Sequence, residues 1–246
     1  MVDVTFITEA GDRLPTLTEE QMREVDRIAM ADFGLGVLQM MENAGRNLAL
    51  HAIENVNDPN AEIVILAGSG GNGGGGISCA RHLRNHGYRV RLFLTRDPSE
   101  LRGSAGAQYH IVEKAGLTAT VASEAEEHVQ QAALVIDALI GYSLKGAPRG
   151  ITKELIETAN EFSDRTLALD IPSGFDSTSG ETPGVAIKPH STLTLALPKT
   201  GLREVPGELY VADIGIPPEV YLPLGITLEP FFGGAYWVRI TAAEGG

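Results

Sequence analysis

Residues 63–77 read Ile63-Val64-Ile65-Leu66-Ala67-Gly68-Ser69-Gly70-Gly71-Asn72-Gly73-Gly74-Gly75-Gly76-Ile77, an uncharged apolar run that stops in a glycine-rich loop. Glycine loses more backbone entropy on folding than any other residue, so this concentration calls for close approach of the backbone to another group. The pattern predicts a buried strand, a loop and then a helix over 77–85. The N-terminal N–H groups of that helix would attract an anion such as phosphate. A flexible surface loop is the alternative interpretation.

Apolar strands and helices alternate on both sides of this loop. The capping box Thr18-Glu19-Glu20-Gln21 predicts the start of the first helix. Continuous apolar strands separated by helices indicate a parallel sheet buried on both faces, and late strands without helices between them extend it at one side. We expect one α/β domain over residues 1–246, with 241–246 disordered. The remaining predicted helices are 37–55, 104–115, 124–131 and 153–161, and the further strands are 88–95, 117–122, 133–137, 166–170, 191–197, 207–214 and 237–240.

The composition excludes several classes of function. The chain has 246 residues, of which 43% are hydrophobic and 21% charged, as in an ordinary soluble globular protein. Its formal net charge of −13 argues against a broad nucleic-acid or anionic-membrane surface. The single cysteine, Cys79, is expected to be a buried structural thiol in a reducing compartment. The N-terminal residues contain no long apolar run, so we expect neither a signal peptide nor a membrane span, and a cytoplasmic protein.

Polar residues stand where three predicted strands end. Asn72 follows the first strand, Asp137 closes the strand 133–137, and Asp170 closes the strand 166–170, with Ser173 close behind. In open α/β sheets, ligands bind beyond the carboxyl ends of the strands. An aspartate after buried aliphatic residues is costly unless it is paired, binds a cation or takes part in chemistry, although a helix cap or a turn is the alternative. Asn72, Asp137 and Ser173 together offer only oxygen ligands, which suit a hard cation and not zinc or copper.

Three further residues allow two interpretations each. Lys145 could bring a positive charge to a phosphate, together with Arg149, or could be solvated. Asn43 lies beside the apolar face of the helix 37–55 and is either a hydrogen-bonding element or exposed. The loop also matches G-x-G-x-x-G, with Asp97 at the distance of a ribose contact, as in an NAD-dependent dehydrogenase. That motif explains neither the extra glycines nor the two aspartate-ended strands.

Six separated segments, in order, resemble the NAD(P)H-hydrate epimerase family, also called the YjeF N-terminal domain. The resemblance covers roughly residues 17–218. The segments are Leu38-Gln39-Met40-Met41-Glu42-Asn43-Ala44-Gly45, the glycine loop with Ala80-Arg81-His82-Leu83, Asp137-Ala138-Leu139-Ile140-Gly141, Asp170-Ile171-Pro172-Ser173-Gly174-Phe175-Asp176, Pro198-Lys199-Thr200-Gly201-Leu202 and Ala212-Asp213-Ile214-Gly215-Ile216-Pro217.

This resemblance implies a Rossmann-like three-layer α/β/α sandwich with a mostly parallel central sheet, commonly as a homodimer. It implies an isomerase that interconverts the R and S epimers of hydrated NADH and NADPH, working with an NAD(P)H-hydrate dehydratase in cofactor repair. A potassium ion is expected at Asn72, Asp137 and Ser173, and Asp137 is the residue expected to transfer the proton. The hydrated dinucleotide is expected at Gly71, Asn72, Gly73, Gly74, Gly75, Gly141, Tyr142, Ser143, Leu144, Lys145, Gly146, Ala147 and Asp170.

The glycine loop departs from the family pattern, which usually reads Gly-Pro-Gly-Asn-Asn-Gly-Gly-Asp-Gly. Here Gly71 replaces the first asparagine and Gly75 replaces the aspartate. Loss of that carboxylate removes an acceptor for a ribose or nicotinamide group, an interaction of about 1.5–3 kcal/mol, or roughly ten- to a hundredfold in affinity. The alternative function is therefore a weakened or inactive relative that acts as a nucleotide-binding or interaction module.

Overall fold

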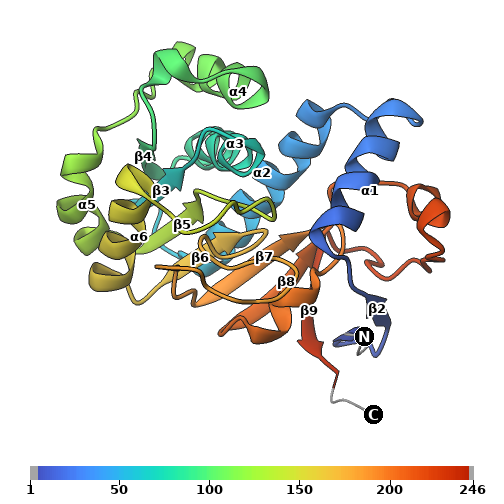
Figure 1. The fold of residues 1–246 in the computed structure, drawn as a ribbon. Coiled ribbons are helices and arrows are strands. Elements are labelled where there is room, and N and C mark those ends of the chain that lie inside the picture. The colour runs from blue at the N-terminus through green and yellow to red at the C-terminus, as the bar shows by residue number, and fades with distance from the viewer. Residues whose placement is uncertain (1–4, 244–246) are drawn as a thin grey trace.

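The computed structural model describes residues 5–243, which contain one nine-stranded sheet (Figure 1). The strand order is β2-β1-β9-β8-β7-β6-β5-β3-β4. The strands are β1 (Thr5–Thr8), β2 (Arg13–Pro15), β3 (Glu62–Ala67), β4 (Arg89–Leu94), β5 (Leu134–Ala138), β6 (Thr166–Leu169), β7 (Ser191–Leu195), β8 (Glu208–Ala212) and β9 (Trp237–Ala242).

Strands β3 to β8 form the parallel part of the sheet, and β9, β1 and β2 extend it by antiparallel pairing. This confirms the expected mostly parallel sheet with an extension at one side. Within the parallel part the chain starts at β3, adds β4 on one side and then β5, β6, β7 and β8 on the other. The direction in which strands are added therefore reverses at β3, which has β4 on one side and β5 on the other. Open α/β sheets bind ligands beyond the carboxyl ends of the strands at such a point. A dinucleotide-binding dehydrogenase has a different order, 3-2-1-4-5-6.

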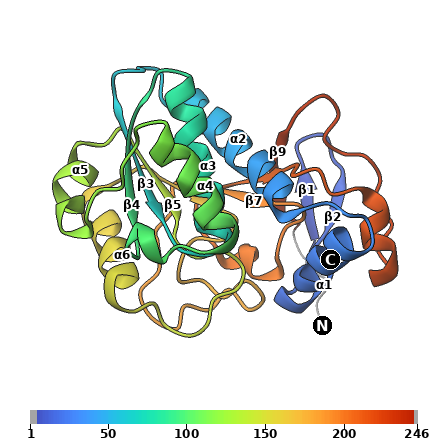
Figure 2. The same ribbon diagram turned by 90° about the horizontal axis from the view of Figure 1, so that it is seen from above.

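Helices cover both faces of the sheet, which gives the three-layer arrangement (Figure 2). Ile63 and Ile65 of β3 point to the face covered by α2 and α3, and Val64 and Leu66 point to the face covered by α5 and α6. α1 packs over the antiparallel end of the sheet. The helices are α1 (Glu19–Ala31), α2 (Val37–Asn55), α3 (Gly71–Asn85), α4 (Gly103–Lys114), α5 (Ala125–Gln131) and α6 (Gly150–Phe162). No helix in residues 5–243 has the length and apolar character needed to cross a membrane.

The glycine run is mostly helix and not loop, which corrects the predicted helix start. α3 begins at Gly71, six residues before the expected start at Ile77. A Cβ added at Gly73 would lie 1.8 Å from the carbonyl oxygen of Gly68, and one at Gly76 would lie 2.5 Å from Cβ of Ala138. Gly73 and Gly76 are therefore required because the first turns of α3 pack directly against the chain at the ends of β3 and β5.

Two further predictions were wrong, and others were confirmed. Residues 117–122 form no strand, because the segment lies outside the edge strand β4 and pairs with it at a single bridge, Phe93 to Thr120. Thr241 and Ala242 are ordered in β9, because they pair with β1, a strand that the sequence analysis missed. Residues 244–246 lie outside the described part.

The capping box at Thr18 is present. Cys79 is buried, and burial raises the pKa of its thiol.

Candidate functional site

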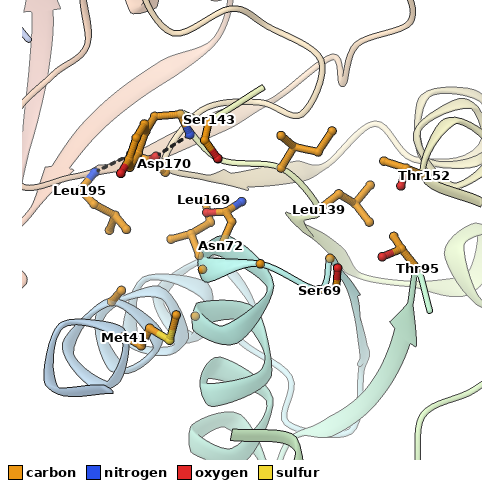
Figure 3. Close-up of a pocket in the computed structure, with 18 of the residues that line it drawn as sticks. Met41, Ser69, Asn72, Thr95, Leu139, Ser143, Thr152, Leu169, Asp170 and Leu195 are labelled. Atoms are coloured by element: carbon orange, nitrogen blue, oxygen red, sulfur yellow. Dashed lines mark hydrogen bonds between the residues drawn. The ribbon is translucent and has the colours of Figure 1, made fainter. Parts of the chain in front are cut away.

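A cavity of about 800 Å³ lies at the carboxyl ends of the parallel strands, at the point where the strand order reverses. Segments that follow β3, β4, β5 and β6 line it, together with parts of α1 and α2. Figure 3 shows Asn72 and Asp170 on one side of this cavity and Thr95 and Thr152 on the other. The volume falls in the range of small-molecule and cofactor sites.

The N-terminus of α3 opens onto the cavity. Gly70 is the N-cap residue and has no side chain to accept a hydrogen bond from the first turn. Gly70, Gly71 and Asn72 all line the cavity. The first N–H groups of a helix have no partner within the helix, and the helix dipole places positive potential there. This end of α3 can therefore hold an anionic group.

Asp137 and Ser173 form a buried hydrogen-bonded pair. Ser173 donates to Asp137 from its backbone N–H, at 2.8 Å, and from its hydroxyl, at 2.6 Å. Leu139 N–H donates to the same carboxylate at 3.1 Å. Burial raises the pKa of Asp137 to about 6, although these three hydrogen bonds act in the opposite direction. Both side chains are fully buried, and neither is among the residues that line the cavity.

Asn72 lies in the first turn of α3 and reaches the loop after β5. A Cβ added at Gly141 would be 3.2 Å from Asn72 Oδ1 and 3.2 Å from Asp170 Oδ2, so a side chain at position 141 would crowd both groups. The amide nitrogen of Asn72 is buried and has no hydrogen-bond partner within residues 5–243. A buried polar atom without a partner is uncommon in a folded protein, and this one belongs to a residue of the cavity wall.

Asp170 is held by an unusual backbone and a buried ion pair. Its φ of 69° lies in the left-handed region, which few non-glycine residues adopt, although Asp and Asn do so more often than the others. Lys199 Nζ forms an ion pair with Asp170 Oδ1 and also donates to the Leu195 carbonyl at 2.8 Å. Tyr142 N–H donates to Asp170 Oδ2 at 3.1 Å. Asp170 and Lys199 both line the cavity, so it contains a fixed pair of opposite charges.

The structure brings only part of the predicted substrate site to the cavity. Seven of the predicted residues line it: Gly71, Asn72, Gly75, Gly141, Tyr142, Ser143 and Asp170. The other six predicted residues are not among the residues that line it: Gly73, Gly74, Leu144, Lys145, Gly146 and Ala147. Lys145 is exposed, whereas Arg149 lines the cavity.

Two alternatives left open by the sequence are decided by hydrogen bonds. Asn43 Nδ2 donates to the carbonyl of Ile214 at 3.0 Å, so Asn43 fixes a segment that lines the cavity. Asp97 also lines the cavity, but its Oδ1 accepts hydrogen bonds from Ser99 N–H and Oγ, as a cap of the following turn. The dehydrogenase interpretation therefore loses support from both the strand order and Asp97.

Sequence reasoning missed four charged residues of the cavity wall, namely Asp26, Arg96, Glu100 and Lys199. Lys199 lies in the segment Pro198-Lys199-Thr200-Gly201-Leu202, which had been noted only as part of the family resemblance. Asp26 had a visible signal, because it falls on the buried face of α1 beside Met22, Val25 and Ala29. An acidic residue within an apolar helical stripe indicates a partner or a function.

Similarity to known proteins agrees with this architecture. The model of the family described as YjeF-related protein N-terminus matches residues 37–201. The NAD(P)H-hydrate epimerase of Dehalogenimonas lykanthroporepellens is 44% identical over 97% of this chain and 98% of its own length. A bifunctional NAD(P)H-hydrate repair enzyme Nnr of Hyperthermus butylicus is 40% identical over 78% of this chain but only 37% of its own. The crystal structure of the yeast protein YNL200c superposes with a TM-score of 0.81 at 22% identity, over 92% of this chain and all of the yeast chain, which shows the shared fold. The chain belongs to the family of YjeF-related protein N-terminal domains.

Proposed function

We propose that this chain is an NAD(P)H-hydrate epimerase, an isomerase that interconverts the R and S epimers of hydrated NADH and NADPH. The observation that carries the proposal is the cavity at the point where the strand order reverses, which combines an uncapped helix N-terminus with a buried carboxylate–lysine pair. It occurs in a chain that is 44% identical, over nearly its full length, to a protein named NAD(P)H-hydrate epimerase.

The chemistry of the cavity wall suits a hydrated dinucleotide. The phosphates would lie at the N-terminus of α3, beside Gly71 and Asn72, with Arg96 and Arg149 as further positive charges on the wall. A chain of net charge −13 can still bind this anion, because the backbone N–H groups and these two arginines act locally. The segment Gly141–Ser143 and Asp170 would contact the remainder of the ligand.

A potassium ion fits the polar groups beneath this wall. Asn72, Asp137 and Ser173 would hold it, and their oxygen atoms comprise one carboxylate and two neutral donors, which suits a hard cation of low charge. The fit rests on Asp137, whose buried carboxylate is surrounded by three neutral hydrogen-bond donors and has no ion-pair partner in residues 5–243. When bound, potassium would supply a positive charge close to the reacting ring. Because Asp137 lies outside the cavity wall, its position suits this role better than direct proton transfer.

The substitution at position 75 is matched by the packing around it. A Cβ added at Gly75 would lie 2.9 Å from Cδ2 of Leu169, a fully buried side chain of the cavity wall. Leu169 therefore fills the room that an aspartate at position 75 would need. At position 71, in contrast, the nearest atom to an added Cβ is Cε of Met41 at 3.6 Å, which is ordinary contact. We propose that the pair Gly75 and Leu169 is compatible with activity in an apolar form of the pocket. If the assay below detects no epimerisation, the chain is instead a non-catalytic nucleotide-binding module.

We propose an NAD(P)H-hydrate dehydratase as the functional partner, because epimerisation alone does not restore NADH or NADPH. Relatives named bifunctional NAD(P)H-hydrate repair enzymes are longer than this chain, which spans about 40% of their length. We propose that this chain supplies an epimer to an NAD(P)H-hydrate dehydratase, acts as a homodimer, and works in the cytoplasm.

The experiment mixes both epimers of hydrated NADH with this protein and an S-specific dehydratase in potassium buffer, and follows recovery of NADH. We expect the R form to be consumed much faster than without this protein, and Asp137→Ala to abolish the gain. Glu157→Gln, an exposed carboxylate of α6, is the control and should leave the rate unchanged. The epimerase proposal is wrong if the R form is consumed no faster with this protein than without it.

The potassium proposal has a separate test that does not depend on activity. Potassium, compared with tetramethylammonium at equal ionic strength, should raise the unfolding temperature of the wild type, because a ligand that binds only the folded state stabilises it. The same comparison on Asp137→Asn should show no difference. An equal effect of potassium on both proteins would contradict the proposed ligand set.

A further inference from the structure

A carboxyl group and a phenol meet on the cavity wall. The family resemblance supplied the tyrosine, Tyr142, but not the carboxyl group, Asp26. The hydroxyl of Tyr142 donates to Oδ2 of Asp26 at 2.6 Å. Asp26 comes from α1 and Tyr142 from the loop after β5, so the contact joins residues 116 positions apart. Both side chains are half-buried, and both residues line the cavity.

Asp26 differs from Asp170, which is another carboxyl group of this wall. Asp170 has Lys199 as its ion-pair partner, whereas the neighbouring cation of α1, Arg23, is paired with Glu19 at 2.5 Å. Asp26 is left with a neutral phenol as its direct partner. Burial is the largest influence on Asp26 and raises its pKa, while the hydrogen bond from Tyr142 lowers it. Asp170 thus lies inside an ion pair, whereas Asp26 has no cation as its direct partner among the described residues.

Tyr142 fixes the position of this second carboxyl group. Its backbone N–H donates to Asp170 Oδ2 at 3.1 Å, and its carbonyl accepts from Ser177 Oγ at 2.8 Å. The tyrosine backbone is therefore held independently of its hydroxyl. The hydroxyl occupies Oδ2 of Asp26, and the other oxygen, Oδ1, accepts no hydrogen bond from the residues that the structure describes.

We propose that Asp26 is the catalytic acid–base of this site and that Tyr142 is its positioning residue, an inference that rests on the proposed function. The hydrated carbon of the substrate carries a hydroxyl next to the ring nitrogen. Asp26 protonates that hydroxyl, the C–O bond breaks with its electron pair passing to oxygen, and the nitrogen lone pair forms a C=N bond as water leaves. Water then adds to the opposite face, the C=N pair returns to nitrogen, and the released proton restores the acid. Atoms and electrons balance without an oxidant or reductant.

The test uses the coupled assay described above with Asp26→Asn, Asp26→Glu and a matched control, Glu24→Gln, which removes an exposed carboxylate of the same helix. We expect Asp26→Asn to lower kcat about a hundredfold or more, the usual contribution of a general acid–base, with KM changed much less. Asp26→Glu should recover part of kcat, and Glu24→Gln should match the wild type. Thermal unfolding of each variant identifies any loss that is due to misfolding.

The dependence of activity on pH tests the positioning role of Tyr142, because a purely structural role would leave that dependence unchanged. Tyr142→Phe removes the hydrogen bond that lowers the pKa of Asp26, so the loss of activity at high pH should shift to higher pH. The titratable and charged groups that face Asp26 are Arg23 on its own helix, Tyr142, Asp170 and Lys199 across the cavity, and Tyr221 from the segment Pro218–Leu224. All of these except the Tyr142 hydroxyl are unchanged in the variant.

The outcomes separate this proposal from the one on which it rests. An inactive wild type overturns the proposed function, and the assignment of Asp26 with it. An active wild type whose Asp26→Asn variant keeps its kcat within about threefold overturns the assignment of Asp26 alone. An unshifted profile for Tyr142→Phe overturns the positioning role. If Asp26→Asn fails to fold, the kcat of Asp26→Glu tests the role of Asp26, and the pH profile of Tyr142→Phe tests the role of Tyr142.

Discussion

Replacing Lys199 by methionine should destabilise the fold strongly, because it leaves the charge of Asp170 buried without its partner. The two side chains are 1% and 5% exposed, so water replaces the lost interaction poorly. In the wild type, Lys199 Nζ also has Thr194 Oγ1 at 3.3 Å and the Leu195 carbonyl at 2.8 Å as acceptors. Removing one partner of such a pair typically costs about 3–5 kcal/mol, a large part of the roughly 5–15 kcal/mol by which domains are stable. Methionine retains most of the aliphatic stem, so the loss reports on the charge.

Urea unfolding of four proteins measures this cost: the wild type, Lys199→Met, Asp170→Asn and the double variant. Asparagine tolerates the left-handed φ of position 170, so Asp170→Asn should not add backbone strain. We expect each single variant to lose several kcal/mol and the double variant to lose clearly less than their sum, with a coupling of about 1–3 kcal/mol. Lys153→Met, which removes an exposed pair with Glu157 at 3.5 Å, should change the free energy of unfolding by less than about 1 kcal/mol. Single variants that lose under about 1 kcal/mol, or strictly additive losses, would refute the reasoning.

Three further predictions concern the glycine helix and a buried histidine. Gly75→Asp alone should lower the unfolding temperature, because the new side chain meets Leu169. Adding Leu169→Ala to Gly75→Asp should raise that temperature again. Equal unfolding temperatures for the single and the double variant would contradict the packing argument. Gly76→Ala should cost about 1–3 kcal/mol in urea unfolding, whereas Gly70→Ala, with nothing within 4 Å of its added Cβ, should cost much less. Burial lowers the pKa of His51 to about 4, so the unfolded state binds more protons between pH 6.5 and 4 and the wild type loses stability as the pH falls through that range. His51→Phe should remove up to about 3 kcal/mol of this loss, and parallel stability–pH curves for the two proteins would contradict it.

Local sequence was sufficient for most of the architecture, because the decisive signals act over a few residues. The apolar run before the glycines, the capping box at Thr18 and the alternation of strands and helices predict the parallel sheet and its helical layers. The same signals place Asn72 and Asp170 at the ends of their strands, and the topology of such sheets brings those ends together. These parts of the site could therefore be predicted without coordinates.

The remaining features depend on contacts between distant parts of the chain. β1 and β2 have four and three residues and exist because β9 pairs with β1, so nothing local distinguishes them from a loop. The glycine run is read as a loop because glycine is a poor helix former, whereas close packing against the strand ends makes its residues the start of α3. Asp26 and Lys199 reach the cavity from segments 173 residues apart, and their roles come from partners that only the folded chain supplies. Burial and pairing are properties of the packed chain, so the pattern of strands and helices can be predicted from sequence, while the electrostatics of the cavity come from the tertiary structure.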